Sequence, residues 1–308
     1  MGALATDPLA CCELCPRRCR ANRRAGQRGW CRAGVEAEVY RWAPHFGEEP
    51  PLVGRGGSGT VFFGRCTLRC LYCQNYPWSQ LGAGRPCGVE ELAEALRALR
   101  RAGCHNWNLV SPTPWLPQIQ AALELARRDG AALPVVYNTS GYERVETLRR
   151  YAGLADIYLP DLRYARPETA RAASGAADYV ETARAAVREM WRQAGPLRRA
   201  ADGTARGGTI CRLLILPGHA QETVANLRWL AEHIGPQIAV SVMAQYVPAH
   251  AAADGPAPWN RRLRPEEYDA VREALETLGF ADGWLQELGD APAELLGFRM
   301  RPDGTEGT

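Results

Sequence analysis

The stretch CTLRCLYCQN, residues 66–75, places Cys66, Cys70 and Cys73 at spacings of three and two. A closed structural metal site takes four protein ligands, whether the metal is zinc or an iron–sulfur cube. Three thiolates on one short loop leave one position of the metal centre without a protein ligand. The spacing therefore favours an open [4Fe–4S] cluster whose fourth iron binds a substrate or cofactor. A zinc ion with a distant fourth ligand is the alternative, although zinc ribbons usually use paired Cys-x-x-Cys knuckles.

The text that follows this loop alternates between short apolar runs and amphipathic helical patterns. The predicted strands cover residues 60–63, 106–111, 133–138, 155–160, 211–216 and 238–243. Such alternation predicts a parallel sheet joined by crossover helices, and six units of this kind form a curved, partly open α/β barrel. The three-cysteine loop begins just after the first strand, at the carboxyl edge where the active sites of such sheets lie.

Two of the connecting helices have clear apolar faces and clear ends. Residues 89–103 carry Val89, Leu92, Leu96 and Leu99 on one face and end at a glycine. Residues 265–279 begin with a proline in the first turn and also end at a glycine. Proline at the start and glycine at the end are typical helix boundaries.

The chain divides into three predicted segments. Residues 1–59 form a cysteine-, glycine- and arginine-rich module with little periodicity, which ends in a predicted flexible glycine loop, GRGGSGT. Residues 60–286 form the partial (β/α)6 barrel, and residues 287–308 form a C-terminal tail.

The N-terminal module holds a second cysteine cluster. Cys12, Cys15, Cys19 and Cys31 have spacings of two, three and eleven, and Cys11 is a weaker additional candidate. Four soft ligands make a closed site, either a structural zinc or a second [4Fe–4S] cluster. The spacing does not separate the two, but we favour iron–sulfur because the other cysteine cluster already points to that cofactor. A second cluster can relay electrons, whereas zinc would hold together a module with little core of its own.

Composition restricts the location and the partners of the protein. The 308 residues are 46% hydrophobic and carry a formal charge of only +3, so we expect no nucleic-acid or membrane partner. No apolar run is long enough for a transmembrane helix, and the first residues do not have the pattern of a signal peptide. We therefore predict a cytoplasmic protein whose clustered cysteines bind metal rather than form disulfides. All 37 basic residues are arginine, which is typical of a GC-rich genome such as that of an actinomycete.

The segment CTLRCLYC also resembles the Cys-x3-Cys-x2-Cys signature of the radical S-adenosylmethionine (SAM) superfamily. From about residue 12 to 286 the chain resembles the pyruvate formate-lyase activating enzyme-like subgroup, through the segments CELCPRRC, HFGEEPPLVGRGGSG, CLYCQN, VVYNTSGY, DIYLPDLRY, LILPG and MAQYVP. The resemblance implies that the amino and carboxylate groups of SAM chelate the free iron. Reductive cleavage of SAM then gives methionine and a 5′-deoxyadenosyl radical, which takes a hydrogen atom from the substrate.

The resemblance also assigns residues to the cofactor. Ser111 and Thr113, after the second strand, would accept hydrogen bonds from the SAM amino group, where many relatives have Gly-Gly-Glu. Asn138 and Ser140, after the third strand, would lie near the methionine part.

Four further positions carry over from the same family pattern. Asp161 and Arg163 occupy the fourth-strand motif that resembles Asp-x-Lys, and the arginine can pair with a carboxylate through its planar fork. Arg212 resembles an arginine that faces the SAM carboxylate, and Tyr72 would stack near the adenine. Because neighbouring strand residues point to opposite faces, Cys211 would face the helices rather than donate hydrogen.

Other residues concern the substrate, and no catalytic residue is assigned from the sequence. Relatives tend to have histidine where this chain has Pro114 and Leu213, which suggests a changed substrate. His45 would line the site, and the pair Glu48–Glu49 is either a substrate anchor or a solvated loop.

We weigh three functions. The first is hydrogen abstraction from a small molecule, such as sugar epimerisation in antibiotic biosynthesis, with a flavodoxin- or ferredoxin-type electron donor. The second is a glycyl-radical-enzyme activase that acts on a partner protein. The third is a non-catalytic iron–sulfur or zinc protein.

Overall fold

The computed structural model describes residues 7–128, 130 and 132–289, which fall into two compact units. The first unit comprises Met1–Leu68, Trp78–Pro160 and Thr182–Thr209, and the second comprises Arg69–Pro77, Asp161–Glu181 and Ile210–Thr308. Their division falls within the three-cysteine loop, so that Cys66 belongs to the first unit and Cys70 and Cys73 to the second.

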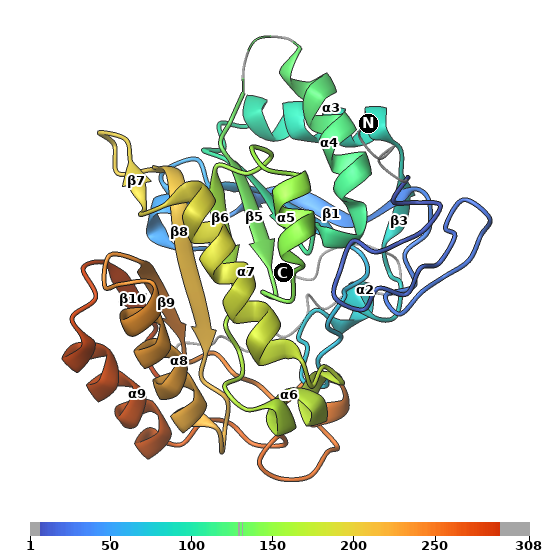
Figure 1. Cartoon of the computed structure of the whole chain (residues 1–308). Helices are drawn as coiled ribbons and strands as arrows, with labels where there is room; N and C mark the ends of the chain where they lie inside the picture. Colours follow the sequence, from blue (N-terminus) through green and yellow to red (C-terminus); the bar gives the residue numbers. More distant parts are fainter. Residues whose placement is uncertain (1–6, 129, 131, 290–308) are drawn as a thin grey trace, which may run out of the picture. The chain divides into compact units, whose positions relative to one another are not determined.

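A parallel sheet forms the centre of the first unit (Figure 1). Its strands pair in the order β2 (Ser58–Phe63), β4 (Trp107–Val110), β5 (Val135–Thr139), β6 (Ile157–Pro160) and the start of β8 (Ala205–Leu214). Three antiparallel strands extend it: β1 (Ala37–His45) on β2, β3 (Arg85–Cys87) on β1, and β7 (Arg198–Arg199) on β8. The helices of this unit are α1 (Pro50–Val53), α3 (Val89–Arg101), η1 (Thr113–Trp115), α4 (Leu116–Arg127), α5 (Val145–Arg150) and most of α7 (Tyr179–Ala194).

The second unit continues from the end of β8, with β9 (Ala239–Met243) and β10 (Gly283–Leu285) paired in parallel beside it. Its helices are α6 (Pro167–Ser174), α8 (Ala220–His233), η2 (His250–Ala252) and α9 (Pro265–Leu278), and α8 packs against α9. The short helix α2 (Tyr76–Ser79) has residues in both units.

Side-chain alternation gives the parallel sheet of the first unit two different faces. One face packs against α3 and α4 through buried apolar residues such as Phe63, Leu109, Leu96 and Leu123. The indole Nε1 of Trp107 on this face donates to the carbonyl of Leu96 at 2.7 Å, so its one polar group is satisfied. The opposite face, which we call the inner face, carries two layers in register: Thr60, Asn108, Val136 and Ile157, and nearer the carboxyl ends Phe62, Val110, Asn138 and Leu159.

The predicted fold class is confirmed: the protein is mixed α/β with a partly open parallel sheet. All six predicted strands are present as β2, β4, β5, β6, β8 and β9, and the two predicted helices are α3 and α9. Helix α9 begins with a proline and ends at Gly279, whose φ of 65° is left-handed, as its cap pattern predicted. Residues 290–308 of the predicted tail lie outside the described residues, and the segment bounds at 59 and 286 stay predictions.

The end of the N-terminal module differs from the sequence expectation. Residues 37–45 form a strand, β1, and the expected flexible glycine loop runs directly into β2. Its glycines are needed for close packing: a Cβ on Gly56 would lie 2.0 Å from the carbonyl oxygen of Gly103, and one on Gly59 would lie 2.5 Å from that of Asn106. This loop is therefore fixed against the turn before β4 within the first unit.

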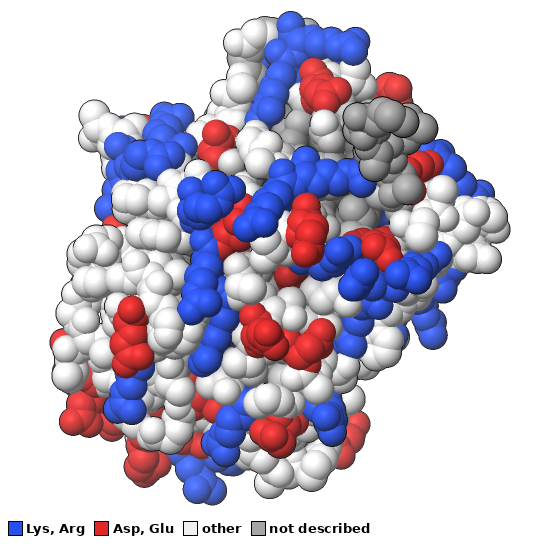
Figure 2. Space-filling view, in the orientation of Figure 1, with Lys and Arg blue, Asp and Glu red and all other residues white. Residues whose placement is uncertain are grey.

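No helix in residues 7–128, 130 and 132–289 is both long enough and apolar enough to span a bilayer. On the face drawn in Figure 2, acidic side chains are interspersed among the arginines, as a small net charge leads one to expect.

Candidate active site

The three-cysteine loop follows β2 after a two-residue turn. Arg65 and Arg69, immediately before Cys66 and Cys70, have φ angles of 69° and 61°, a left-handed conformation that is uncommon for residues other than glycine. In the first unit the backbone N–H of Leu68 donates to Cys66 Sγ at 3.4 Å. Strained backbone and N–H groups aimed at sulfur are the local features expected of a loop that holds a metal through its thiols.

Cys70 and Cys73 belong to the second unit, where a short turn connects them. The N–H of Cys73 donates to the carbonyl of Cys70 at 3.2 Å. The buried Cys70 sulfur accepts a hydrogen bond from the Tyr164 hydroxyl at 3.7 Å, and that hydroxyl also lies 2.6 Å from Ser174 Oγ. An O–H donor on a thiolate stabilises its negative charge, as the groups around metal-bound sulfur do.

The ligand chemistry of this loop fits an iron–sulfur cluster. None of the three cysteines forms a disulfide, and hydrogen-bond donors point at the sulfurs of Cys66 and Cys70. Within the described part of the chain, no three His, Cys, Asp or Glu side chains are already gathered in the geometry of a metal site. The assignment of Cys66, Cys70 and Cys73 as ligands therefore stays a prediction that rests on their chemistry and spacing.

Tyr72 lies within an aromatic cluster of the second unit. Its ring stacks on that of Trp259 at 5.7 Å and 9°, and it contacts Tyr246 at 5.6 Å. Its hydroxyl lies 2.8 Å from the hydroxyl of Tyr164. Burial raises the pKa of Tyr72 above its ordinary value, so this ring is neutral and packed between elements of its own unit. Its contact with adenine remains a prediction.

The structure brings together the three charged residues predicted to face SAM. Asp161 and Arg212 occupy adjacent positions of a parallel bridge between the end of β6 and β8, and the N–H of Leu162 donates to the Arg212 carbonyl at 2.8 Å. The guanidinium of Arg163 pairs with the Asp161 carboxylate. Burial by itself lowers the pKa of Arg163, but Asp161 together with the nearby Cys70, Tyr72 and Tyr164 outweighs it and raises this pKa well above the ordinary value. Arg163 therefore pairs with a carboxylate, as the resemblance implies, and that carboxylate is Asp161.

The two predicted SAM segments of the first unit meet at the carboxyl ends of β4 and β5. Ser111 has a left-handed φ of 60°, and its N–H donates to the Asn138 carbonyl at 2.9 Å. Ser140 is half-buried two residues further on. The Thr113 hydroxyl, by contrast, donates to the carboxylate of Glu143 at 2.5 Å and is thus already engaged within the protein.

Glu143 is a site residue that the sequence interpretation missed. Its side chain is 1% exposed, and its carboxylate also accepts hydrogen bonds from Thr139 Oγ1 at 2.5 Å and the Tyr137 hydroxyl at 3.3 Å. Burial raises the pKa of Glu143 to about 7, although its hydroxyl neighbours oppose the rise. The carboxyl group thus joins the loops after β4 and β5. The only signal in the sequence is an acid among hydroxyl residues just after an apolar run, a pattern that solvated loops share.

The N-terminal cysteines form a compact group of turns in the first unit. Cys12 and Cys15 are buried, Cys31 is half-buried and Cys19 is exposed. Burial raises the pKa of the Cys31 thiol to about 11. Three arginines adjacent to Cys19 and Cys31 have left-handed φ angles: Arg18, Arg20 and Arg32. The same combination of cysteines and left-handed neighbours as in the three-cysteine loop makes a metal site here chemically reasonable.

Arginine and glutamate residues fasten this module to three strand-end loops of the first unit. Arg17 Nε donates to the carbonyl of Thr67, in the three-cysteine loop, at 3.3 Å. Arg23 Nη1 donates to the carbonyl of Pro114, after β4, at 2.6 Å. From the loop after β5, Arg144 Nη1 donates to the carbonyl of Glu13 at 2.7 Å. The sequence did not reveal these contacts, because an arginine that binds a distant carbonyl leaves no local pattern.

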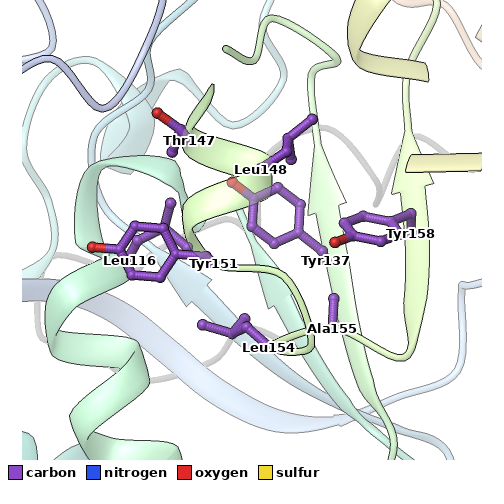
Figure 3. A pocket seen from close by; sticks show the side chains of 8 residues that line it. All are labelled: Leu116, Tyr137, Thr147, Leu148, Tyr151, Leu154, Ala155 and Tyr158. Carbon is purple, nitrogen blue, oxygen red and sulfur yellow. The ribbon is translucent and has the colours of Figure 1, made fainter. Parts of the chain in front are cut away.

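The remaining candidates are Cys211, His45 and a small cavity. Cys211 is fully buried, while its neighbour Arg212 is half-buried, as expected for the opposite faces of a strand. His45 packs edge-on against Phe62 of the inner face at 5.7 Å. A small cavity of about 10 Å³ lies beside α5. It is lined mainly by apolar groups and tyrosine rings, among them Leu116, Tyr137 and Tyr158 (Figure 3). A space of that size holds about one water molecule and is not a substrate site.

Comparison with known proteins shows which family part of the chain resembles. Residues 60–194, less than half of the chain, match the sequence model of the Radical SAM superfamily. Membership of that superfamily would imply a [4Fe–4S] cluster and SAM as cofactors.

Individual relatives are more distant. An uncharacterized protein of Methanocaldococcus jannaschii is 28% identical over 276 residues, which covers 86% of this chain and 74% of the relative. HydG, a maturase of the [FeFe]-hydrogenase, has a TM-score of 0.51 with 14% identity over 75% of this chain. The enzyme anSMEcpe with bound AdoMet and a peptide has a TM-score of 0.48 with 11% identity over 71% of this chain. The chain spans only 52% and 60% of the lengths of these two solved structures, and the likeness to HydG is one of fold alone.

These findings show a sequence likeness of residues 60–194 to the Radical SAM superfamily and a likeness of fold to HydG. They confirm neither the pyruvate formate-lyase activating enzyme-like subgroup nor a second cluster or zinc at the N-terminal cysteines.

Proposed function

We propose that this protein cleaves SAM reductively and abstracts a hydrogen atom from a small-molecule substrate. Sugar epimerisation in natural-product biosynthesis is the first reaction to test. The observation that carries the proposal is the loop of three cysteines, none of them in a disulfide, directly after the first parallel strand of the segment that matches the Radical SAM superfamily model. Superfamily members act on small molecules or peptides with an external reductant, which fits a flavodoxin- or ferredoxin-type donor here.

Cys66, Cys70 and Cys73 would hold the cluster, and hydrogen bonds from Leu68 N–H and the Tyr164 hydroxyl would stabilise two of the sulfurs. A cluster held there would supply the electron that splits SAM into methionine and a 5′-deoxyadenosyl radical, which would remove the substrate hydrogen atom. Arg212 would face the SAM carboxylate, while Arg163 remains paired with Asp161. Ser111, Asn138 and Ser140 would bind SAM from the ends of β4 and β5, with Tyr72 near the adenine.

The N-terminal cysteines would hold a second metal centre, which we propose is a [4Fe–4S] cluster rather than zinc. The contact of Arg17 with Thr67 supports a close association of this module with the three-cysteine loop. Iron, sulfide and zinc contents per chain, measured for wild type and Cys12→Ala, test this assignment. If the variant loses zinc and keeps all its iron, the module is a zinc site.

The central test is the formation of 5′-deoxyadenosine from SAM by the reduced, anaerobically reconstituted chain. We expect Cys66→Ala, Cys70→Ala and Cys73→Ala to abolish it, whereas Cys104→Ala, which removes a buried thiol outside both clusters, keeps it. Loss of a metal-binding thiol removes the cluster and not merely packing. Activity that survives in any of the three loop variants contradicts the proposal.

The substrate is tested with the same preparation. An altered small molecule by mass spectrometry supports the tailoring reaction. A persistent glycyl radical on an added partner enzyme, seen by electron paramagnetic resonance, would instead indicate an activase. A chain that forms no 5′-deoxyadenosine under reductant would be a non-catalytic metalloprotein.

A further inference from the structure

The inner face of the parallel sheet carries one polar side chain in the middle of its first layer. Asn108 lies on β4 between Thr60 of β2 and Val136 of β5, in register with both. One layer nearer the carboxyl ends lie Phe62 and Val110. Asn108 is therefore surrounded by largely apolar strand residues, just below the edge where the three-cysteine loop begins.

Asn108 is fully buried, with an exposure of 0%, and only half of its amide is satisfied. Its Nδ2 donates to Glu48 Oε1 at 2.8 Å and more weakly to Thr60 Oγ1 at 3.5 Å. A carboxylate can only accept, so the amide nitrogen must face Glu48 and the amide orientation is fixed. Oδ1 then has no hydrogen-bond partner among the described residues.

A second buried asparagine, just before β4, shows what a purely structural residue looks like here. Asn106 is also buried, but its Oδ1 accepts from Ser58 Oγ at 2.7 Å and its Nδ2 donates to the carbonyl of Leu52 at 2.7 Å. Asn106 thus anchors the segment before β2 with both ends satisfied. Leaving a buried amide oxygen unpaired is costly, so Asn108 needs a different explanation.

We propose that Asn108 Oδ1 and the half-buried Glu48 carboxylate form a substrate-binding subsite on the inner face. Both groups are acceptors, so the ligand must present hydrogen-bond donors there, either the protonated amine or the hydroxyl groups of a polar small molecule. The apolar side chains of Phe62, Val110 and Val136 would border the rest of the ligand and keep water away from it.

This inference rests on the proposed function, because it assigns the substrate class of that enzyme. It also gives the pair Glu48–Glu49 a definite role. Glu48 is hydrogen-bonded to the buried strand residue, whereas the structure gives Glu49 no such contact with Asn108.

The test is calorimetric titration of the full, reconstituted chain with SAM present. Three sugars of similar size serve as probes: D-glucosamine, which has an ammonium and hydroxyls, D-glucose, which has hydroxyls only, and D-gluconate, which adds a carboxylate. We expect at least one of the first two to bind and gluconate not to bind, because its charge repels Glu48. Stronger binding of glucosamine would identify the amine as the recognised donor, and equal binding would identify the hydroxyls.

Two variants tie the binding to the subsite. Asn108→Leu and Glu48→Gln should each weaken binding of the donor sugar at least tenfold, since each removes a buried hydrogen bond to the ligand. Glu36→Gln, which neutralises an exposed acid of the same unit, should bind it like wild type. Glu48→Gln changes a half-buried group isosterically, so it decides the matter even if Asn108→Leu does not fold.

The outcomes separate the inference from the proposed function. Formation of 5′-deoxyadenosine is measured on the same samples, and its absence in wild type refutes the proposed function. If wild type forms 5′-deoxyadenosine but binds neither donor sugar, binds gluconate as well, or loses nothing in Glu48→Gln, the subsite is refuted.

Discussion

Replacement of Glu143 by glutamine should change how the stability of the protein depends on pH. The folded pKa of Glu143 is about 7 against an ordinary value of 4.5, and burial is the main cause. A raised folded pKa means that the carboxyl group favours folding most below about pH 4.5 and loses this contribution as the pH rises to about 7. At 1.36 kcal/mol per pKa unit, the loss amounts to about 3 kcal/mol, of which about 2 kcal/mol falls between pH 5.5 and pH 8.

The assay is anaerobic urea unfolding of the reconstituted wild type and Glu143→Gln at pH 5.5, 6.5, 7.5 and 8. We expect the variant to gain about 2 kcal/mol in unfolding free energy relative to wild type between the two extremes, because glutamine carries no charge at any of these values. Glu189→Gln is the matched control. The hydrogen bonds and ion pair with Arg192 lower the pKa of Glu189 to about 2. Protonation of Glu189 therefore changes the stability only below pH 5.5, outside the range of the assay. If the difference in unfolding free energy between wild type and Glu143→Gln stays constant with pH, the raised pKa of Glu143 is refuted.

Four further predictions concern the module, the loop glycines, the core and the SAM-binding residues. Arg17→Gln removes the contact with the Thr67 carbonyl and should lower the iron content of the three-cysteine loop and the rate of 5′-deoxyadenosine formation severalfold, whereas Arg32→Gln, on an exposed arginine, should not. Gly56→Ala forces a Cβ to within 2.0 Å of a backbone oxygen and should destabilise the fold by about 2 kcal/mol or more in urea unfolding, while Gly88→Ala, with open space around it, stays near wild type. Leu96→Ala, in the core between α3 and the sheet, should cost about 2–5 kcal/mol by the same measurement. Arg212→Ala should raise the KM for SAM at least tenfold with little change in stability, and an unchanged KM would remove Arg212 from the predicted SAM contacts.

Local pattern was enough to predict the central strands and the main helices. The runs that became β5 and β6 are short, apolar and bounded by turns, and α3 and α9 carry apolar stripes that end in glycine. In each case the signal lies within about fifteen residues of the chain, which is the range over which side-chain periodicity acts. The three-cysteine spacing was an equally local signal.

What the sequence did not predict depends on residues far apart in the chain. Strand β1 contains Pro44 and has exposed positions, features that argue against a strand, and it is held by antiparallel pairing with β2. Glu143 looks like a solvated acid until β4 and β5 bring three hydroxyls around it. The half-satisfied amide of Asn108 is likewise visible only once Glu48 and Thr60 have been placed beside it.

The contacts of the N-terminal module bear on why the chain has two cysteine clusters. Three arginine side chains connect this module to the loops after β2, β4 and β5: Arg17, Arg23 and Arg144. Each donates to a backbone carbonyl, and the contact forms only when the module is ordered. A metal bound by Cys12, Cys15, Cys19 and Cys31 would add its binding free energy to the folding of the module. Through the three arginines, part of that free energy would order the loops that carry Cys66, Ser111 and Ser140. On this reasoning the module supports the cofactor site through its structure whether it binds iron or zinc, and electron relay would be an additional role of an iron–sulfur cluster.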